Sequence, residues 1–107
     1  MPDRDALNVS GATLIAAERR RQAVDEGYLA DHDDNHVHGE LLAAADVYLR
    51  SARYPGAMSG DPCPEGWPWP EPCHPTTPIR DLIKAGALIA AEIDRRLRSN
   101  ESTYVEG

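Results

Sequence analysis

The sequence predicts an all-α protein: a three-helix antiparallel bundle with a long proline- and tryptophan-rich loop between the second and third helices. Apolar residues recur at helical spacing in three separate stretches. Helix-start signals, a serine and a Thr-Pro pair, precede two of these stretches. Most of the nine prolines fall within residues 54–77, where neither a helix nor a sheet interior is expected.

The first helix is expected over about residues 11–26. Ser10 is a credible N-cap, and Gly27 stands where helices commonly end. The rest of the helix is polar, and within it Glu18 and Gln22 lie four residues apart, able to share a ligand or to pair with arginine. The expected core face consists of Leu14, Ala17, Val24 and Tyr28.

The second helix is expected over about residues 36–53, with Asp34 or Asn35 as its cap. Asp46 and Arg50, four residues apart, form a favourable helical pair. The periodicity predicts a buried face that consists of Leu41, Ala45, Tyr48 and Ala52, widened by Leu42 and Leu49.

The third helix gives the clearest signal, over about residues 78–98. It begins with Thr77 as a hydroxyl cap and Pro78 at the first helical position. Gly86 costs about 1 kcal/mol of helix propensity, but it permits the close approach of another helix backbone. The expected core seam, nearly coiled-coil in period, consists of Ile79, Leu82, Gly86, Ile89, Ile93 and Leu97.

Residues 54–77 are expected to form an ordered strap. A disordered linker rarely carries two tryptophans, whereas Trp67 and Trp69 can lie across a helix surface or a neighbouring subunit. With residues 1–9 as a polar lead and residues 99–107 as a frayed tail, the 107 residues make a single helical domain.

Composition and charge argue against several classes of function. The net charge of −7 argues against direct DNA binding, because a phosphate backbone requires a basic surface. No apolar run is long enough to span a membrane and no targeting segment is evident, so a cytoplasmic location is expected. In that compartment Cys63 and Cys73 are expected as thiols or metal ligands before a disulfide. Because the chain lacks Phe and is rich in Ala, we expect a homo-oligomer, at least a dimer.

The segment Asp31–Glu40 concentrates histidines and carboxylates, and three interpretations stay open. Its acidic residues cap the next helix, its side chains bind a metal ion, or a histidine beside a carboxylate transfers protons. Carboxylate-rich ligation favours Mg²⁺ or Mn²⁺, whereas Zn²⁺, with ligands from Cys63 and Cys73-His74, is less favoured. The candidate metal ligands are His32, Asp33, Asp34, His36 and Glu40.

Six fragments of the chain occur in an order that resembles a small protein family common in phage and prophage genomes. They are AAERRRQ, EGY, HDDNH, GELLAAADVYL, WPWP and RDLIKAGALIAAEIDR, and they cover about residues 15–96. The resemblance implies a phage-type helical protein, in the host cytoplasm when phage-encoded, without naming an activity.

The chain resembles more distantly the MazG-like all-α nucleotide pyrophosphohydrolases, which hold Mg²⁺ between carboxylates of an EExxE helix and an ExxD helix. GELLAAAD matches the end of the first motif at Glu40, whereas the two preceding glutamates fall at His36 and Val37. The nearest match to the second motif is Glu92 with Asp94, one residue too close. The resemblance therefore implies the fold more strongly than the active site.

These resemblances imply a protein that binds a nucleotide or a nucleotide-derived phosphate, and that is either a divergent Mg²⁺-dependent pyrophosphohydrolase or a non-catalytic binding protein. The non-catalytic alternative is a phage factor that sequesters a host signalling nucleotide or binds a host protein. Glu40 and Asp34 are the expected catalytic residues. The expected ligand-binding residues are Arg19, Arg20, Gln22, Trp67 and Trp69, with arginine on phosphate and tryptophan on a base.

Overall fold

The computed structural model describes residues 10–25, 39–55, 66–70 and 72–99 of the chain. Within these ranges it contains three helices and no strands, which confirms the prediction of an all-α class. Helix α2 spans Gly11–Asp25, α4 spans Glu40–Arg53 and α5 spans Pro78–Arg98. None of these three helices combines the length and the apolar character needed to cross a bilayer.

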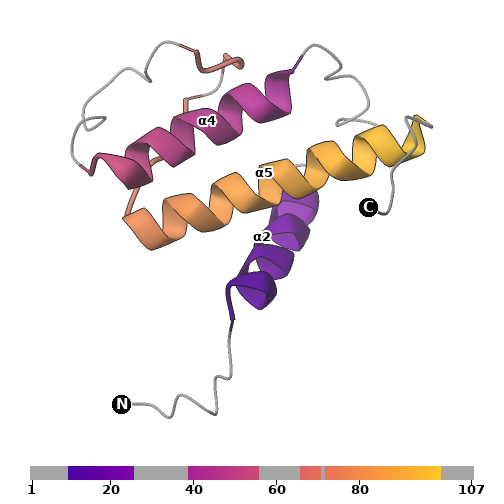
Figure 1. The fold of residues 1–107 in the computed structure, drawn as a ribbon, viewed down its shortest axis with the longest axis horizontal. Helices are drawn as coiled ribbons and strands as arrows, with labels where there is room; N and C mark the ends of the chain where they lie inside the picture. The colour runs from indigo at the N-terminus through magenta and orange to yellow at the C-terminus, as the bar shows by residue number, and fades with distance from the viewer. Residues whose placement is uncertain (1–9, 26–38, 56–65, 71, 100–107) are drawn as a thin grey trace, which may run out of the picture.

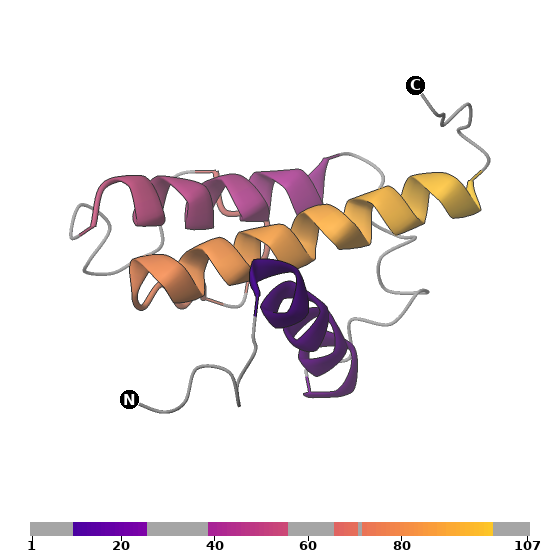
Figure 2. The same cartoon turned by 60° about the horizontal axis from the view of Figure 1, so that its bottom comes forward.

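Helix α5 is the centre of the arrangement. Helix α4 lies beside it and runs in the opposite direction, whereas α2 crosses it steeply (Figures 1 and 2). The main packing contacts among the described helices are those of α4 with α5 and of α2 with α5. Two different sides of α5 are therefore covered, one by each of the other helices.

The ends of α5 follow from its local sequence. The Arg80 backbone N–H donates to the Thr77 side-chain oxygen at 3.2 Å, and Pro78 occupies the first turn. At the other end the Ser99 N–H donates to the carbonyls of Arg95 and Arg96, at 3.1 and 3.2 Å. The bounds of α5 therefore coincide with the range that its sequence predicts.

Helix α4 begins later than its sequence predicts. The N-cap is Gly39, whose backbone is left-handed with φ at 87°, and no side chain caps the helix there. Because a residue in that conformation cannot continue a right-handed helix, the predicted start near His36 is wrong and α4 starts at Glu40. The predicted caps Asp34 and Asn35 lie outside the described residues.

The core lies mainly between α4 and α5. It combines four residues of α4 with three small or aliphatic residues of α5, and Trp67, Trp69 and Cys73 of the strap pack against it. The two tryptophans therefore lie across the α4–α5 pair. The buried cluster consists of Leu41, Ala44, Ala45, Tyr48, Ala85, Leu88 and Ala91.

The predicted core seam of α5 is wrong, because most of it faces outward. The exposed fractions are 69% for Ile79, 50% for Leu82, 37% for Ile89, 53% for Ile93 and 47% for Leu97. Alanines take the inner positions, and their small side chains let α4 and α2 approach α5 closely. The buried residues of α5 are Asp81, Ile83, Ala85, Ala87, Leu88, Ala91 and Glu92.

The predicted faces of the other two helices are also corrected. In α2, Val24 is 73% exposed, whereas the polar Glu18 and Gln22 are buried at 2% and 4% exposure. In α4, Leu42 and Leu49 are 38% and 40% exposed. The α4 face is widened instead by Ala44, Val47 and Ser51.

Gly86 marks where α2 meets α5. A Cβ atom added at Gly86 would lie 2.5 Å from Ile15 Cδ1 and 2.9 Å from Ile15 Cγ1. The absence of a side chain therefore admits Ile15 of α2, which is the close helix approach that the glycine predicts.

Candidate functional site

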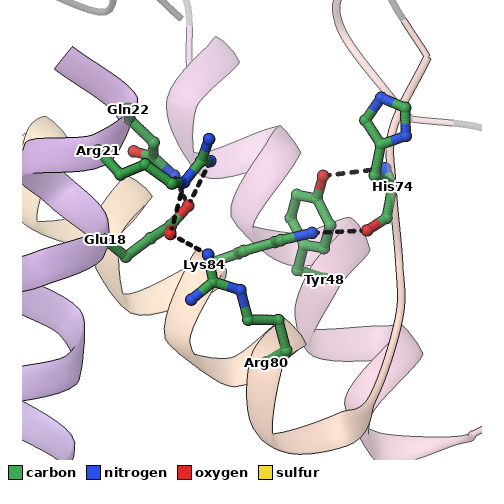
Figure 3. Close-up of polar contacts among 7 residues, drawn as sticks. All are labelled: Glu18, Arg21, Gln22, Tyr48, His74, Arg80 and Lys84. Atoms are coloured by element: carbon green, nitrogen blue, oxygen red, sulfur yellow. Dashed lines mark hydrogen bonds and ion pairs between the residues drawn. The ribbon is translucent and has the colours of Figure 1, made fainter. Parts of the chain in front are cut away.

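A buried carboxylate joins α2 to α5. Arg21 donates to both Glu18 oxygens, at 2.9 Å from Nε and 2.7 Å from Nη2, and Gln22 donates from Nε2 at 3.2 Å. Arg80 of α5 donates a further hydrogen bond to Glu18 Oε1 (Figure 3). Because Glu18 and Arg80 are 62 residues apart, this contact fixes how the two helices cross.

The arginines keep Glu18 ionised in spite of its burial. Burial alone would raise the pKa of the Glu18 carboxyl, but the hydrogen bond and charge of Arg21, with the charge and hydrogen bond of Arg80, outweigh it. The pKa of Glu18 therefore lies below its usual value. Gln22 Oε1 is buried and accepts no hydrogen bond from the described residues.

Lys84 lies one helical turn after Arg80 on the same side of α5 (Figure 3). Its Nζ donates to the His74 carbonyl at 2.7 Å and lies 5.3 Å from the centre of the Tyr48 ring. Burial lowers the pKa of Lys84, and the positive charge of Arg80 lowers it further, against the opposing charges of Asp81 and Glu18.

We refer to Arg21, Arg80 and Lys84 as the basic edge. The side chains of Arg21 and Arg80 remain 34% and 39% exposed, so a ligand in solution can reach them. Among the described residues, the basic edge brings three cations together beside the carboxylates of Glu18 and Asp81, in a chain whose net charge is −7.

Aromatic side chains continue the site from Lys84 toward the strap. Tyr48 and Trp67 meet edge to face with ring centres 5.7 Å apart, and Trp67 and Trp69 do so at 5.3 Å. The His74 N–H donates to the Tyr48 hydroxyl at 3.1 Å (Figure 3). Both tryptophans are partly buried, and Tyr48 lies between Trp67 and Lys84 of the basic edge.

Asp81 fixes the end of the strap. It is 1% exposed and accepts hydrogen bonds at 2.8 Å from the Ser51 hydroxyl and from the Thr76 backbone N–H. These bonds join α4, α5 and the strap immediately beside Arg80. The position of the basic edge is therefore set by buried polar contacts.

A second buried carboxylate lies near the end of α5. Arg95 donates to Glu92 at 3.0 and 2.9 Å, and Arg96 donates to it at 2.6 Å. The hydrogen bond from Arg95 is the main cause that lowers the pKa of Glu92, with Arg96 adding to it against burial. Asp94 pairs with Arg19 at 3.6 Å. The two carboxylates nearest to an ExxD motif are therefore both paired with arginine.

The predicted ligand-binding residues fall into two groups. Gln22, Trp67 and Trp69 lie at or beside the basic edge, whereas Arg19 pairs with Asp94 instead. Arg20 is exposed on α2. The run of arginines on α2 therefore contributes to the basic edge through Arg21.

The predicted metal site lies mostly outside the described residues. Of its ligands only Glu40, also a predicted catalytic residue, is described, and it begins α4 at the opposite end of the α4–α5 pair from Arg80 (Figure 1). The described ranges contain no group of three or more His, Cys, Asp or Glu side chains placed to hold a metal ion. The predicted ligands outside the described residues are His32, Asp33, Asp34 and His36.

The expectation for Cys73 is corrected. Cys73 is disulfide-bonded, and the other cysteine of the chain, Cys63, lies outside the described residues. Because a sulfur in a disulfide is not a thiolate, Cys73 in this state is neither a free thiol nor a Zn²⁺ ligand.

Two residues of the basic edge were missed by the sequence patterns. Arg80 and Lys84 stand in the first two turns of α5, where the helix dipole disfavours cations. Basic residues at a helix start are therefore the signal that would have singled them out.

The described residues form three helices, with the basic edge on α2 and α5 and aromatic residues on α4 and the strap. Comparison with protein-family models, with curated proteins and with solved structures finds no match to this chain. The resemblances to a phage family and to MazG-like enzymes therefore stay predictions.

Proposed function

We propose that this protein binds a nucleotide or a nucleotide-derived phosphate at the basic edge. The observation that carries the proposal is the convergence of Arg21, Arg80 and Lys84, from two helices, in an acidic chain. Arginine suits phosphate because a guanidinium has five N–H donors, of which Arg21 uses those on Nε and Nη2 to bind Glu18, and lysine adds a point charge. A phosphate group is therefore the anion to which these converging cations are suited.

The neighbouring aromatic residues support a nucleotide more than a bare phosphate. Tyr48 contacts both Lys84 and Trp67, and Trp67 contacts Trp69, so the aromatic residues extend from the basic edge to the strap. A base stacked on an accessible indole gains about 1–3 kcal/mol. Phosphate would therefore lie on the basic edge, and the base would lie toward the strap.

Binding without turnover is the form of the function that the described carboxylates favour. Glu18 and Glu92 are each held by two arginines, so neither offers a free carboxylate to a metal ion. Hydrolysis would depend on Glu40 and Asp34 with Mg²⁺ or Mn²⁺, which stay predicted roles. A sequestering protein needs only the basic edge.

A thermal-shift assay across nucleotides, with and without Mg²⁺, tests the proposal. A ligand at 100 times its Kd stabilises the fold by about 2.7 kcal/mol, which for a chain of this size is on the order of 10 °C. The double variant Arg80→Ala, Lys84→Ala should lose the shift. Arg53→Ala, which removes an exposed arginine at the end of α4, should keep it.

Analysis of the recovered ligand separates the two forms of the function. Unchanged nucleotide after incubation with Mg²⁺ supports sequestration, whereas released pyrophosphate that disappears in Glu40→Ala supports catalysis. If no nucleotide shifts the wild-type melting temperature, nucleotide binding is rejected and a host protein becomes the alternative partner.

A further inference from the structure

The outward side of α5 carries large aliphatic residues before and after Gly86, the position where Ile15 of α2 packs. We refer to Ile79, Leu82, Ile89, Ile93 and Leu97 as the apolar seam, and their exposed fractions run from 37% to 69%. The seam lies on a sector of α5 distinct from the residues buried against the other helices. Helices α4 and α2 cover two sides of α5, and the apolar seam forms a third side that is suited to packing.

The size of the apolar seam matches what an interface between two copies requires. The exposed parts of its five side chains together equal between two and three whole aliphatic side chains, or roughly 400 Å² of apolar surface. This area is comparable to the largest apolar patch on a typical monomer. A standard interface buries about 800 Å² per partner, of which about two-thirds is apolar in homodimers. The seam alone supplies most of that apolar share.

The distribution of side-chain size also indicates a missing neighbour. Among the described residues, half of the ten buried hydrophobic side chains are alanines, whereas the large aliphatics of α5, except Ile83 and Leu88, are exposed. A spacing near 3.5 residues is typical of a helix that packs along its length against another helix. The unpaired side of α5 therefore has the pattern of a helix–helix contact.

The apolar seam is complementary to itself when two copies of α5 run in opposite directions. Residues placed symmetrically about the middle of α5 are then opposite each other: Ile79 faces Leu97, and Leu82 faces Ile93. In a two-fold interface each such contact occurs twice. The antiparallel direction also places the start of each helix beside the end of the other, which suits their dipoles.

We propose that the protein is a homodimer in which the apolar seam of α5 packs antiparallel against the seam of a second copy. The occupant of this surface is thus the same chain, and the basic edge remains on a different side of α5. Dimerisation and ligand binding are therefore independent in this arrangement.

Sedimentation equilibrium of the full chain tests the proposal. Wild-type protein is expected at twice the 11.7 kDa of one chain. The double variant Leu82→Glu, Ile93→Glu is expected at the mass of one chain, with dimer affinity reduced at least 100-fold and an unchanged far-UV circular dichroism spectrum. Both positions are about half exposed, so the fold of one chain tolerates the change. Val24→Glu, on the exposed face of α2, is the matched control and should stay dimeric.

Cysteine cross-linking gives a second test that needs no loss of folding. In an antiparallel pair, a mixture of Leu82→Cys and Ile93→Cys chains should form a cross-linked heterodimer under mild oxidation. Leu82→Cys alone should not, because its two copies lie on the order of 16 Å apart along the helix. Wild-type protein that stays monomeric at high concentration overturns the dimer, and efficient cross-linking of Leu82→Cys alone overturns the antiparallel arrangement.

Discussion

Replacing Glu18 by glutamine is the most informative single perturbation of the fold. Glu18→Gln preserves shape but removes the negative charge that Arg21 and Arg80 share across the α2–α5 contact. The variant leaves two guanidinium groups beside a neutral amide. We therefore expect α2 to lose much of its attachment to α5.

The expected loss follows from burial and partial exposure. Removing one partner of a buried ion pair costs about 3–5 kcal/mol. The Glu18 side chain is fully buried, but Arg21 and Arg80 are 34% and 39% exposed, so water resolvates part of their charge. With that screening we expect a loss of about 2–3 kcal/mol in the free energy of unfolding. For a chain of this size, the melting temperature should fall by about 8–20 °C.

Urea denaturation followed by circular dichroism at 222 nm measures this loss. Asp46→Asn is the matched control, because it breaks a helical carboxylate–arginine pair of 3.1 Å whose Asp46 side chain is 62% exposed. That control should lose no more than about 0.5 kcal/mol. A double-mutant cycle of Glu18→Gln with Arg80→Gln should show a coupling of about 1–3 kcal/mol. If Glu18→Gln lowers the free energy of unfolding no more than Asp46→Asn does, the buried charge of Glu18 does not stabilise the contact of α2 with α5.

Three further perturbations test other parts of the structure. Gly86→Ala should lower the free energy of unfolding by about 1 kcal/mol in urea titrations. Overpacking against Ile15 costs about 1–3 kcal/mol, and the higher helix propensity of alanine offsets about 1 kcal/mol of that cost. In an Ile15→Ala background the same substitution should stabilise the protein instead. Asp81→Ala should cost about 2 kcal/mol by the same measurement, because it removes the acceptors of the buried Ser51 hydroxyl and of the Thr76 N–H. A loss below about 0.5 kcal/mol would contradict this. The pKa values of Glu18 and Glu92 in the folded protein lie below 4.5. Their contribution to stability is therefore present above about pH 4.5 and is lost as the pH falls through these lowered pKa values. Urea midpoints measured from pH 7 to pH 3 should fall, and they should fall less steeply in Glu18→Gln.

The helix class and the bounds of α5 were predictable because their signals are local. Thr77 and Pro78 define the start of α5 within two residues. Gly39 was also a local signal, since a glycine before Glu40 marks where a left-handed residue can precede a helix. Local sequence therefore predicts where helices begin and end better than which of their faces is buried.

The buried faces were not predictable in the same way, because they depend on residues far away in the chain. Glu18 is buried because Arg80, 62 residues later, neutralises it. The spacing of apolar residues instead predicts that Val24 is buried, but Val24 is exposed. On α5 the periodicity identified a real apolar seam but could not tell whether it packs inside one chain. Of the candidate site, Gln22, Trp67 and Trp69 were predicted, whereas Arg80 and Lys84 required the fold.

Isothermal titration of pyrophosphate, repeated at several pH values from 7 up to the ordinary lysine pKa of 10.5, tests most directly whether phosphate binds at the basic edge. Burial and Arg80 lower the pKa of Lys84 from 10.5, and a bound anion would raise it again, so binding should take up protons. Titrations in two buffers of different ionisation enthalpy measure that uptake. We predict that wild-type protein takes up protons when it binds pyrophosphate. The Lys84→Gln variant should show no such uptake and should bind pyrophosphate at least 10-fold more weakly. Absence of binding, or binding and proton uptake unchanged in Lys84→Gln, would contradict it.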